Sequence, residues 1–162
     1  MKLAVTDANI FIDLIHLDLV ESFFSLNYEF HTSYEIYEEL KEIQKTVINP
    51  FKIKNQLLIQ TPTLIKAEDL KIPTSKLSSS DVSAILLALQ LSSKILSGDR
   101  MLKKVAEENN IEVHGILWVI EAIMNAKIIS KDTACQKAEL LMKVNKRLPT
   151  DECIAKIKSW KK

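Results

Sequence analysis

Glycine and cysteine are scarce in this chain of 162 residues, and their scarcity excludes several kinds of site. The two glycines, Gly98 and Gly115, are too few for the glycine-rich loops that cradle phosphates in P-loop and dinucleotide-binding proteins. The two cysteines, Cys135 and Cys153, are too few for a disulfide framework and have no metal-ligand spacing. We therefore expect neither a nucleotide-binding loop of these kinds nor a structural zinc site.

Long hydrophobic runs are missing as well. Runs such as AILLAL at residues 84–89 are far too short to cross a bilayer. The first residues, MKLAVTDANIF, lose their apolar run at Thr6 and Asp7, unlike a signal peptide. We therefore expect a soluble, cytoplasmic protein without a membrane segment, whose 47% of hydrophobic residues fill the core of one compact domain.

Charge is unevenly distributed, although the net charge is only +1. Residues 1–126 hold 12 Lys and Arg against 17 Asp and Glu, whereas residues 127–162 hold 10 against 4. A basic segment of this kind can bind nucleic acid or an acidic partner, and a solvated helical face explains it equally well. Trp160, near the lysine-rich end, can likewise stack on an RNA base or pack in the core.

Short β-like runs alternate with helical patterns through the first two thirds of the chain. Strands are predicted at residues 2–6, 29–32, 95–96 and 112–114, with helices at 10–26 (broken near 16–18), 34–43, 81–92 and 100–109. Residues 47–79 show no clear period, and the chain after residue 115 is helical in pattern. The alternation predicts an α/β fold, a three-layer sandwich with a central parallel sheet and a helical C-terminal extension. We divide it into a main domain, residues 1–126, and a basic helical extension, residues 127–162, packed on the same domain.

Aspartates stand where a parallel sheet places its ligand site. Ligands gather at the carboxyl ends of parallel strands, and Asp7 follows the first predicted strand while Asp99 follows the strand at 95–96. Asp81 opens an almost wholly apolar helix. Each of these residues can also be a simple helix cap, since a carboxylate accepts bonds from the unpaired N–H groups of a helix start.

Helical geometry distinguishes the adjacent glutamates Glu38 and Glu39. If residues 34–43 form one helix, Ile36, Leu40 and Ile43 share an apolar stripe. Glu39 then lies roughly 65° from the centre of the stripe and Glu38 roughly 170° away. We expect Glu39 to border the buried edge and Glu38 to face solvent.

Four segments in order, TDANIFIDL, EEL, LSSSDVSAILLAL and ILSGDRMLKKVAEENNIEVHG, resemble the acidic motifs of the PIN-domain nucleases. The resemblance covers residues 1–115, and the remainder resembles a PIN-like subgroup related to toxin ribonucleases of toxin–antitoxin pairs. It implies four catalytic carboxylates that hold Mg²⁺ or Mn²⁺: Asp7, Glu39, Asp81 and Asp99. It also implies hydrogen-bonding support from Asn9 and Ser97.

The resemblance implies a metal-dependent endoribonuclease and the toxin of a toxin–antitoxin pair, with RNA as substrate, an antitoxin as partner and a homodimer as assembly. Arg100, Lys103 and Lys104 can contact RNA phosphates, although an exposed helix often carries such residues. Gly98 departs from the pattern, because an additional polar or acidic residue is frequent there in relatives. Two alternatives stay open: a nucleic-acid-binding or partner-binding module with a vestigial acidic cluster, and a DNA-directed nuclease of the same mechanism.

Overall fold

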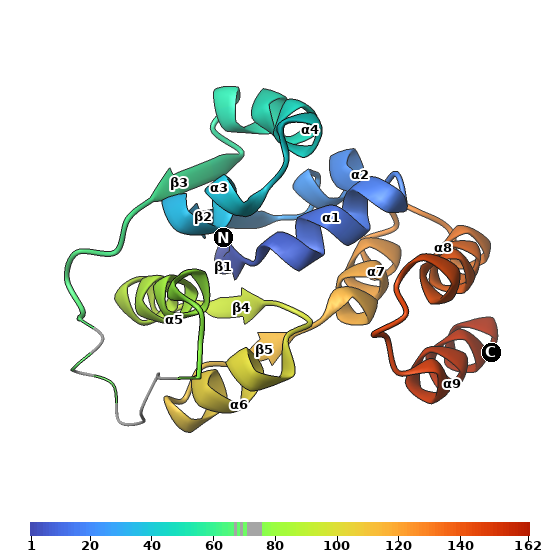
Figure 1. Ribbon diagram of the computed structural model, residues 1–162. Coiled ribbons are helices and arrows are strands. Elements are labelled where there is room, and N and C mark those ends of the chain that lie inside the picture. The colour runs from blue at the N-terminus through green and yellow to red at the C-terminus, as the bar shows by residue number, and fades with distance from the viewer. Residues whose placement is uncertain (67, 69, 71–75) are drawn as a thin grey trace.

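Five parallel strands form one sheet in the order β3-β2-β1-β4-β5. The strands are β1 (Lys2–Thr6), β2 (Tyr28–Ser33), β3 (Leu57–Gln60), β4 (Lys94–Leu96) and β5 (Val113–His114). The computed structural model describes residues 1–66, 68, 70 and 76–162, so part of the segment 47–79 lies outside the described residues. The predicted α/β sandwich with a central parallel sheet is confirmed (Figure 1).

The chain changes direction across the sheet between β1 and β4. From β1 it proceeds to β2 and β3 on one side, and it then returns to β4 and β5 on the other. In open parallel sheets such a switch point leaves a crevice at the carboxyl ends of the strands, where ligands bind. Thr6 is paired with Leu96, and the Asp7 N–H donates to the Leu96 carbonyl at 2.9 Å. Asp7 and Ser97 therefore leave the sheet side by side at this point.

Helices cover both faces of the sheet (Figure 1). Phe30 of β2 stacks on Phe23 of α2 (Val20–Phe24), with ring centroids 4.0 Å apart. Ser33, which points to the opposite face because strand side chains alternate, bonds to Ser83 of α5 (Ser79–Leu91) at 2.6 Å. The other helices are α1 (Ala8–His16), α3 (Tyr34–Glu39), α4 (Glu42–Ile53), α6 (Arg100–Glu108), α7 (Ile116–Asn125), α8 (Lys131–Val144) and α9 (Thr150–Lys161). In the described part of the chain, none is both long and apolar enough to span a membrane.

The single helix predicted over residues 34–43 is wrong, because the chain turns a corner in its second half. α3 ends at Glu39, Leu40 is extended with φ −70° and ψ 140°, and α4 begins at Glu42. Leu40 is buried, with 3% of the residue exposed, although its backbone has left the helical conformation. Ile43 is 76% exposed and shares no buried stripe with the residues of α3.

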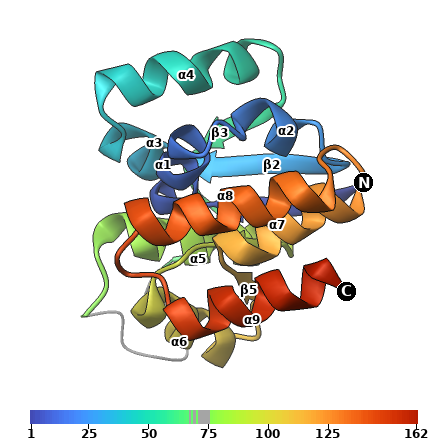
Figure 2. The same ribbon diagram turned by 90° about the vertical axis from the view of Figure 1, so that its right-hand side faces the viewer.

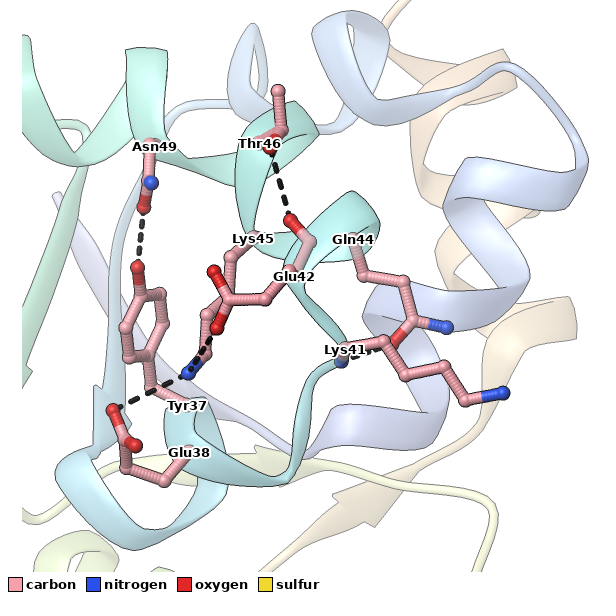
Figure 3. A network of polar contacts seen from close by, with 8 residues as sticks. All are labelled: Tyr37, Glu38, Lys41, Glu42, Gln44, Lys45, Thr46 and Asn49. Atoms are coloured by element: carbon pink, nitrogen blue, oxygen red, sulfur yellow. Dashed lines mark hydrogen bonds and ion pairs between the residues drawn. The ribbon is translucent and has the colours of Figure 1, made fainter.

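Polar contacts hold the corner between α3 and α4 (Figure 3). The Lys41 N–H donates to Oε1 of Gln44 at 2.8 Å, which satisfies one of the free donors where α4 begins. The Tyr37 hydroxyl of α3 donates to Oδ1 of Asn49 in α4. These contacts fix the end of α3, and with it the position of Glu39.

The C-terminal helices α8 and α9 lie on the outer side of α7, away from α5 (Figures 1 and 2). Trp160 of α9 is 3% exposed, and its Nε1–H donates to Oε2 of Glu121 in α7 at 2.7 Å. Nζ of Lys156 lies 3.0 Å from the same carboxylate oxygen. Trp160, for which the sequence left two roles open, is therefore a packing residue.

Candidate active site

Asp7 is the most firmly held carboxylate of the predicted site. Its Oδ1 accepts the Ala8 N–H at 2.9 Å, and its Oδ2 accepts the Ser97 hydroxyl at 2.7 Å and Nδ2 of Asn9 at 3.0 Å. Only 5% of the residue is exposed. Because both carboxylate oxygens have donors, the side chain is fixed at the junction of β1 and α1.

Asn9 and Ser97 tie the loop after β1 to the loop after β4. The Gly98 N–H donates to Oδ1 of Asn9 at 3.0 Å, and the Asp99 N–H donates to the Ser97 hydroxyl oxygen at 3.1 Å. The two predicted supporting residues thus connect Asp7 with the segment that carries Asp99. A Cβ at Gly98 would lie 3.7 Å from Asn9 Oδ1, an ordinary contact, so the fold leaves room for a side chain there.

The three aspartates lie at the starts of helices: Asp7 and Asp99 are N-cap residues, and Asp81, the third residue of α5, belongs to a capping box. Oδ1 of Asp99 accepts the Leu102 N–H at 2.9 Å at the start of α6. Oδ2 of Asp81 accepts the Ser78 N–H at 3.3 Å, while the Ser78 hydroxyl accepts the Asp81 N–H at 3.1 Å, a capping box at the start of α5. Asp7 is the N-cap of α1, where its Oδ1 accepts the Ala8 N–H. Helices that follow parallel strands begin at the carboxyl edge of the sheet, so their capping carboxylates gather at that edge.

Glu38 and Glu39 point to different helices. The buried Ser80 hydroxyl, in the first turn of α5, donates to Oε1 of Glu39. Oε1 of Glu38 lies 3.4 Å from Nζ of Lys45 in α4 (Figure 3). The structure therefore brings Glu39, and not Glu38, to the helix that carries Asp81.

Ser80 is a site residue that no sequence pattern singled out. It stands directly before Asp81 in a run of three serines that reads as ordinary helix-start chemistry. Its contact with Glu39 joins α3 and α5 across 41 residues of sequence. Only the packing of these two helices reveals the contact.

Electrostatic repulsion links the four carboxylates. Burial raises the pKa of Asp7 from 3.8 to about 6; hydrogen bonds from Ser97 and Ala8 oppose the rise, and the charges of Asp81 and Glu39 add to it. Burial also raises the pKa of Asp81, and the charges of Asp99 and Glu39 contribute to the increase. A cation placed among these groups would relieve both the repulsion and the cost of burial.

The donor set suits a hard divalent cation, although it does not form a closed cage. Over the residues that the structure describes, no three His, Cys, Asp or Glu side chains lie close enough together to form a ready-made metal site. Mg²⁺ needs no such cage, since it commonly uses one or two carboxylates and completes its shell with water and substrate phosphate. The oxygen-only donors and their mutual repulsion fit an ion of this class.

The predicted RNA-contacting residues lie along α6. Arg100 is its first residue, directly after Asp99, and its side chain is exposed. Nζ of Lys103 lies 3.9 Å from Glu107 in an exposed pair, and Lys104 is exposed. Of the three, Arg100 is nearest to the acidic edge along the helix.

Comparison with known proteins gives one match over nearly the whole chain. A family model described as "PIN domain" matches residues 3–162. No curated protein matches the sequence significantly. Among solved structures, a PilT N-terminus domain protein from the hyperthermophilic archaeon Sulfolobus solfataricus is similar with a TM-score of 0.49 and 14% identity, covering 75% of this chain and 93% of that chain.

Proposed function

This chain belongs to the PIN-domain family, whose fold is of the nuclease type, and we propose that it is an endoribonuclease that depends on Mg²⁺ or Mn²⁺. The observation that carries the proposal is the group of carboxylates Asp7, Glu39, Asp81 and Asp99, in which the charges of Glu39 and Asp81 act on Asp7 and those of Glu39 and Asp99 act on Asp81. A divalent cation bound there would polarise a phosphodiester and supply a hydroxide nucleophile near neutral pH.

Four carboxylates of the chain would bind the ion, and two neighbouring residues would position them. Asp7, fixed by three hydrogen bonds, would be the rigid ligand. Asp99 uses Oδ1 and Asp81 uses Oδ2 for their caps, so each offers its second oxygen to the ion. Glu39, held by Ser80, would approach from the side of α3. Asn9 and Ser97 would position Asp7 and the loop that carries Asp99.

The proposal includes a place in a toxin–antitoxin pair, with this chain as the toxin. It is supported by the resemblance of residues 116–162 to PIN-like toxins. The proposed protein partners are an antitoxin and a second copy of the chain. A small antitoxin-like reading frame directly upstream of the gene would support this part of the proposal.

Removal of divalent metal tests the enzymatic part directly. We expect the purified protein to cleave single-stranded RNA in Mg²⁺ or Mn²⁺ and to lose this activity in EDTA, because carboxylates alone cannot offset the charge of a phosphodiester. Gel analysis of a labelled RNA, with a DNA of the same sequence as control, measures the effect and the choice of substrate. Undiminished cleavage in EDTA would contradict the proposal, and equal cleavage of the DNA would favour the DNA-directed alternative.

A binding module without catalysis is the second candidate function. It keeps the same fold and leaves the acidic cluster without a catalytic role. In that case the protein would bind RNA and Mn²⁺ without cleaving RNA in any metal. The same cleavage assay, combined with calorimetry of Mn²⁺ binding, separates the two functions.

Replacement of Glu39 by Gln should lower Mn²⁺ affinity and RNA cleavage about tenfold or more. The substitution removes one charged oxygen ligand and keeps an oxygen for the Ser80 hydroxyl, so it tests charge rather than packing. Calorimetry gives the Mn²⁺ affinity, and initial rates of RNA cleavage give the activity.

The adjacent variant Glu38→Gln is the matched control. Glu38 contacts Lys45, which also lies 3.6 Å from Glu42, so the loss of one partially exposed partner should change the free energy of unfolding by no more than about 0.5 kcal/mol. Metal affinity and cleavage should be unchanged. Equal effects of the two variants, or a larger effect at Glu38, would show that Glu39 is not a ligand.

A further inference from the structure

The connection between α8 and α9 lies at the catalytic end of the molecule. In Figure 2 this connection is at the same end as α3 and the start of α5, which mark the carboxyl edge of the sheet. The C-terminus lies at the opposite end of α9, away from this connection (Figure 2). The basic residues of the C-terminal segment are thus divided between the two ends, which the charge pattern of the sequence does not show.

The connection is held in place by Asn145. Its Nδ2 donates to Oδ2 of Asp13 at 3.0 Å, and its Oδ1 accepts the Arg147 N–H at 3.0 Å. The Leu148 N–H donates to the Asn145 carbonyl at 3.3 Å. Asp13 is a carboxylate of α1 that is only 8% exposed, and a buried carboxylate needs such a partner. Residues 145–148 therefore form an anchored turn.

The anchor lies one helical turn from the acidic site. Asp13 follows Asn9 by four residues in α1, and residues four apart on a helix are neighbours on one face, with Cβ atoms about 5–6 Å apart. Asn9 bonds directly to Asp7 and contacts Ser97. The turn that carries Lys146 and Arg147 is thus connected to the catalytic centre through a short, rigid part of α1.

Lys146 and Arg147 are available to a ligand. Both are exposed, and among the described residues neither forms an ion pair. Lys156 of the same basic segment differs, since it is bound to Glu121. In a nuclease, the carboxylates of the acidic site repel the phosphates that flank the cleaved bond. Unpaired cations beside the site can bind these phosphates and offset the repulsion. Arginine in particular matches phosphate with two parallel hydrogen bonds.

We infer that residues 145–148 form a phosphate-binding arm, in which Lys146 and Arg147 hold the backbone of single-stranded RNA beside the acidic site. The inference rests on the proposed function in one respect, namely that the bound RNA is then cleaved. Binding of RNA by the arm does not itself require cleavage. The buried pair of Asp13 and Asn145 sets the position of the arm. Positioning through phosphates carries no base information, so the arm would hold RNA of any sequence.

Two double variants with equal charge change test the arm. Lys146→Ala with Arg147→Ala removes the arm's charges, and Lys161→Ala with Lys162→Ala removes the same charge at the opposite end. Binding of a labelled single-stranded RNA is measured in EDTA at several salt concentrations, so that cleavage does not interfere. The arm variant should bind about tenfold more weakly, and its plot of log affinity against log salt should be flatter by about 1.4, since each neutralised phosphate of a single strand contributes about 0.7. The control should retain wild-type affinity and slope.

A third variant tests the anchor. Asn145→Ala keeps both cations but releases the turn, so RNA affinity should fall while the salt slope stays near that of the wild type.

Equal losses in the two double variants would overturn the inference, and so would an arm variant that binds like the wild type. Cleavage by the wild type is measured separately in Mg²⁺. Cleavage with no dependence of binding on Lys146 and Arg147 rejects the arm alone, whereas arm-dependent binding without cleavage rejects the proposed function alone.

Discussion

Asn in place of Asp99 is expected to reduce RNA cleavage more than about 100-fold while the free energy of unfolding changes by less than about 0.5 kcal/mol. Asn caps helices as well as Asp does, so its side-chain oxygen can still accept the Leu102 N–H at the start of α6. What disappears is one negative charge of the proposed ligand set. Substitution of a residue that merely supports a metal ligand often costs about 10–100-fold, and loss of a ligand itself should cost more.

A second substitution at the same position separates the cap from the ligand. Asp99→Ala removes both, so cleavage should be lost to the same degree and the free energy of unfolding should also fall by about 1 kcal/mol. Initial rates of RNA cleavage and urea unfolding measure the two effects. If the Asn variant cleaves RNA normally and only the Ala variant is impaired, through stability alone, then Asp99 is a helix cap with no part in catalysis.

The elements predicted correctly are those that local pattern determines. β1 shows its apolar run at residues 3–5, and the break predicted near residues 16–18 separates α1, which ends at His16, from α2, which begins at Val20. The side-chain period and the turn residues of these segments act over a few positions. They can therefore be read without knowledge of the rest of the fold.

The corner after α3 could not be predicted in this way. Apolar residues continue at helical spacing through Ile43, and no glycine or proline marks the end of α3 at Glu39. α4 instead takes a new direction, which the hydrogen bond from Tyr37 to Asn49 holds, and a tertiary contact of this kind overrides the local period. The predicted helix placed Ile43 on the buried stripe, but in the structure Ile43 is exposed. The prediction for Glu39 is less affected, because its contact with Ser80 keeps it beside α5.

The candidate site shows the same division between local and distant information. The positions of Asp7 and Asp99 follow from strand–turn–helix patterns that each extend over about ten residues. The contact of Ser80 with Glu39 spans 41 residues and that of Asn145 with Asp13 spans 132. Such pairs leave no local trace, because neither residue is unusual where it stands in the sequence.

Replacement of Asp7 by Asn is expected to have opposite effects on activity and on metal-free stability. Burial raises the pKa of Asp7 from 3.8 to about 6, so the metal-free folded state binds a proton more tightly than the unfolded chain does. Between these pH values the unfolded chain loses its proton first, and the contribution of Asp7 to stability falls as pH rises. Above pH 6 both states are ionised and a constant penalty remains, which corresponds to at most about 3 kcal/mol for this difference in pKa.

The Asn variant removes that penalty but also loses part of the hydrogen bonding at Oδ2, where the Ser97 hydroxyl and Nδ2 of Asn9 both donate. One lost hydrogen bond costs about 1 kcal/mol. The metal-free variant should therefore be more stable than the wild type by about 1–2 kcal/mol at pH 7. At pH 4 the advantage should vanish, because the wild-type carboxyl is then protonated in the fold. Cleavage should fall more than about 100-fold, as for loss of any rigid ligand.

Urea unfolding in EDTA at pH 4 and pH 7, with cleavage measured in Mn²⁺, tests both halves of this expectation. Asp132→Asn is the control, since Asp132 is an exposed aspartate in the first turn of α8, and it should change neither cleavage nor the pH dependence of stability. Mn²⁺ should stabilise the wild type at pH 7 more than the Asn variant, because only the wild type has the buried charge for the cation to neutralise. If the Asn variant loses stability equally at both pH values, Asp7 serves as a structural hydrogen-bond acceptor for Ser97 and Asn9. That result would contradict the proposed role of its carboxylate as the central metal ligand of the site.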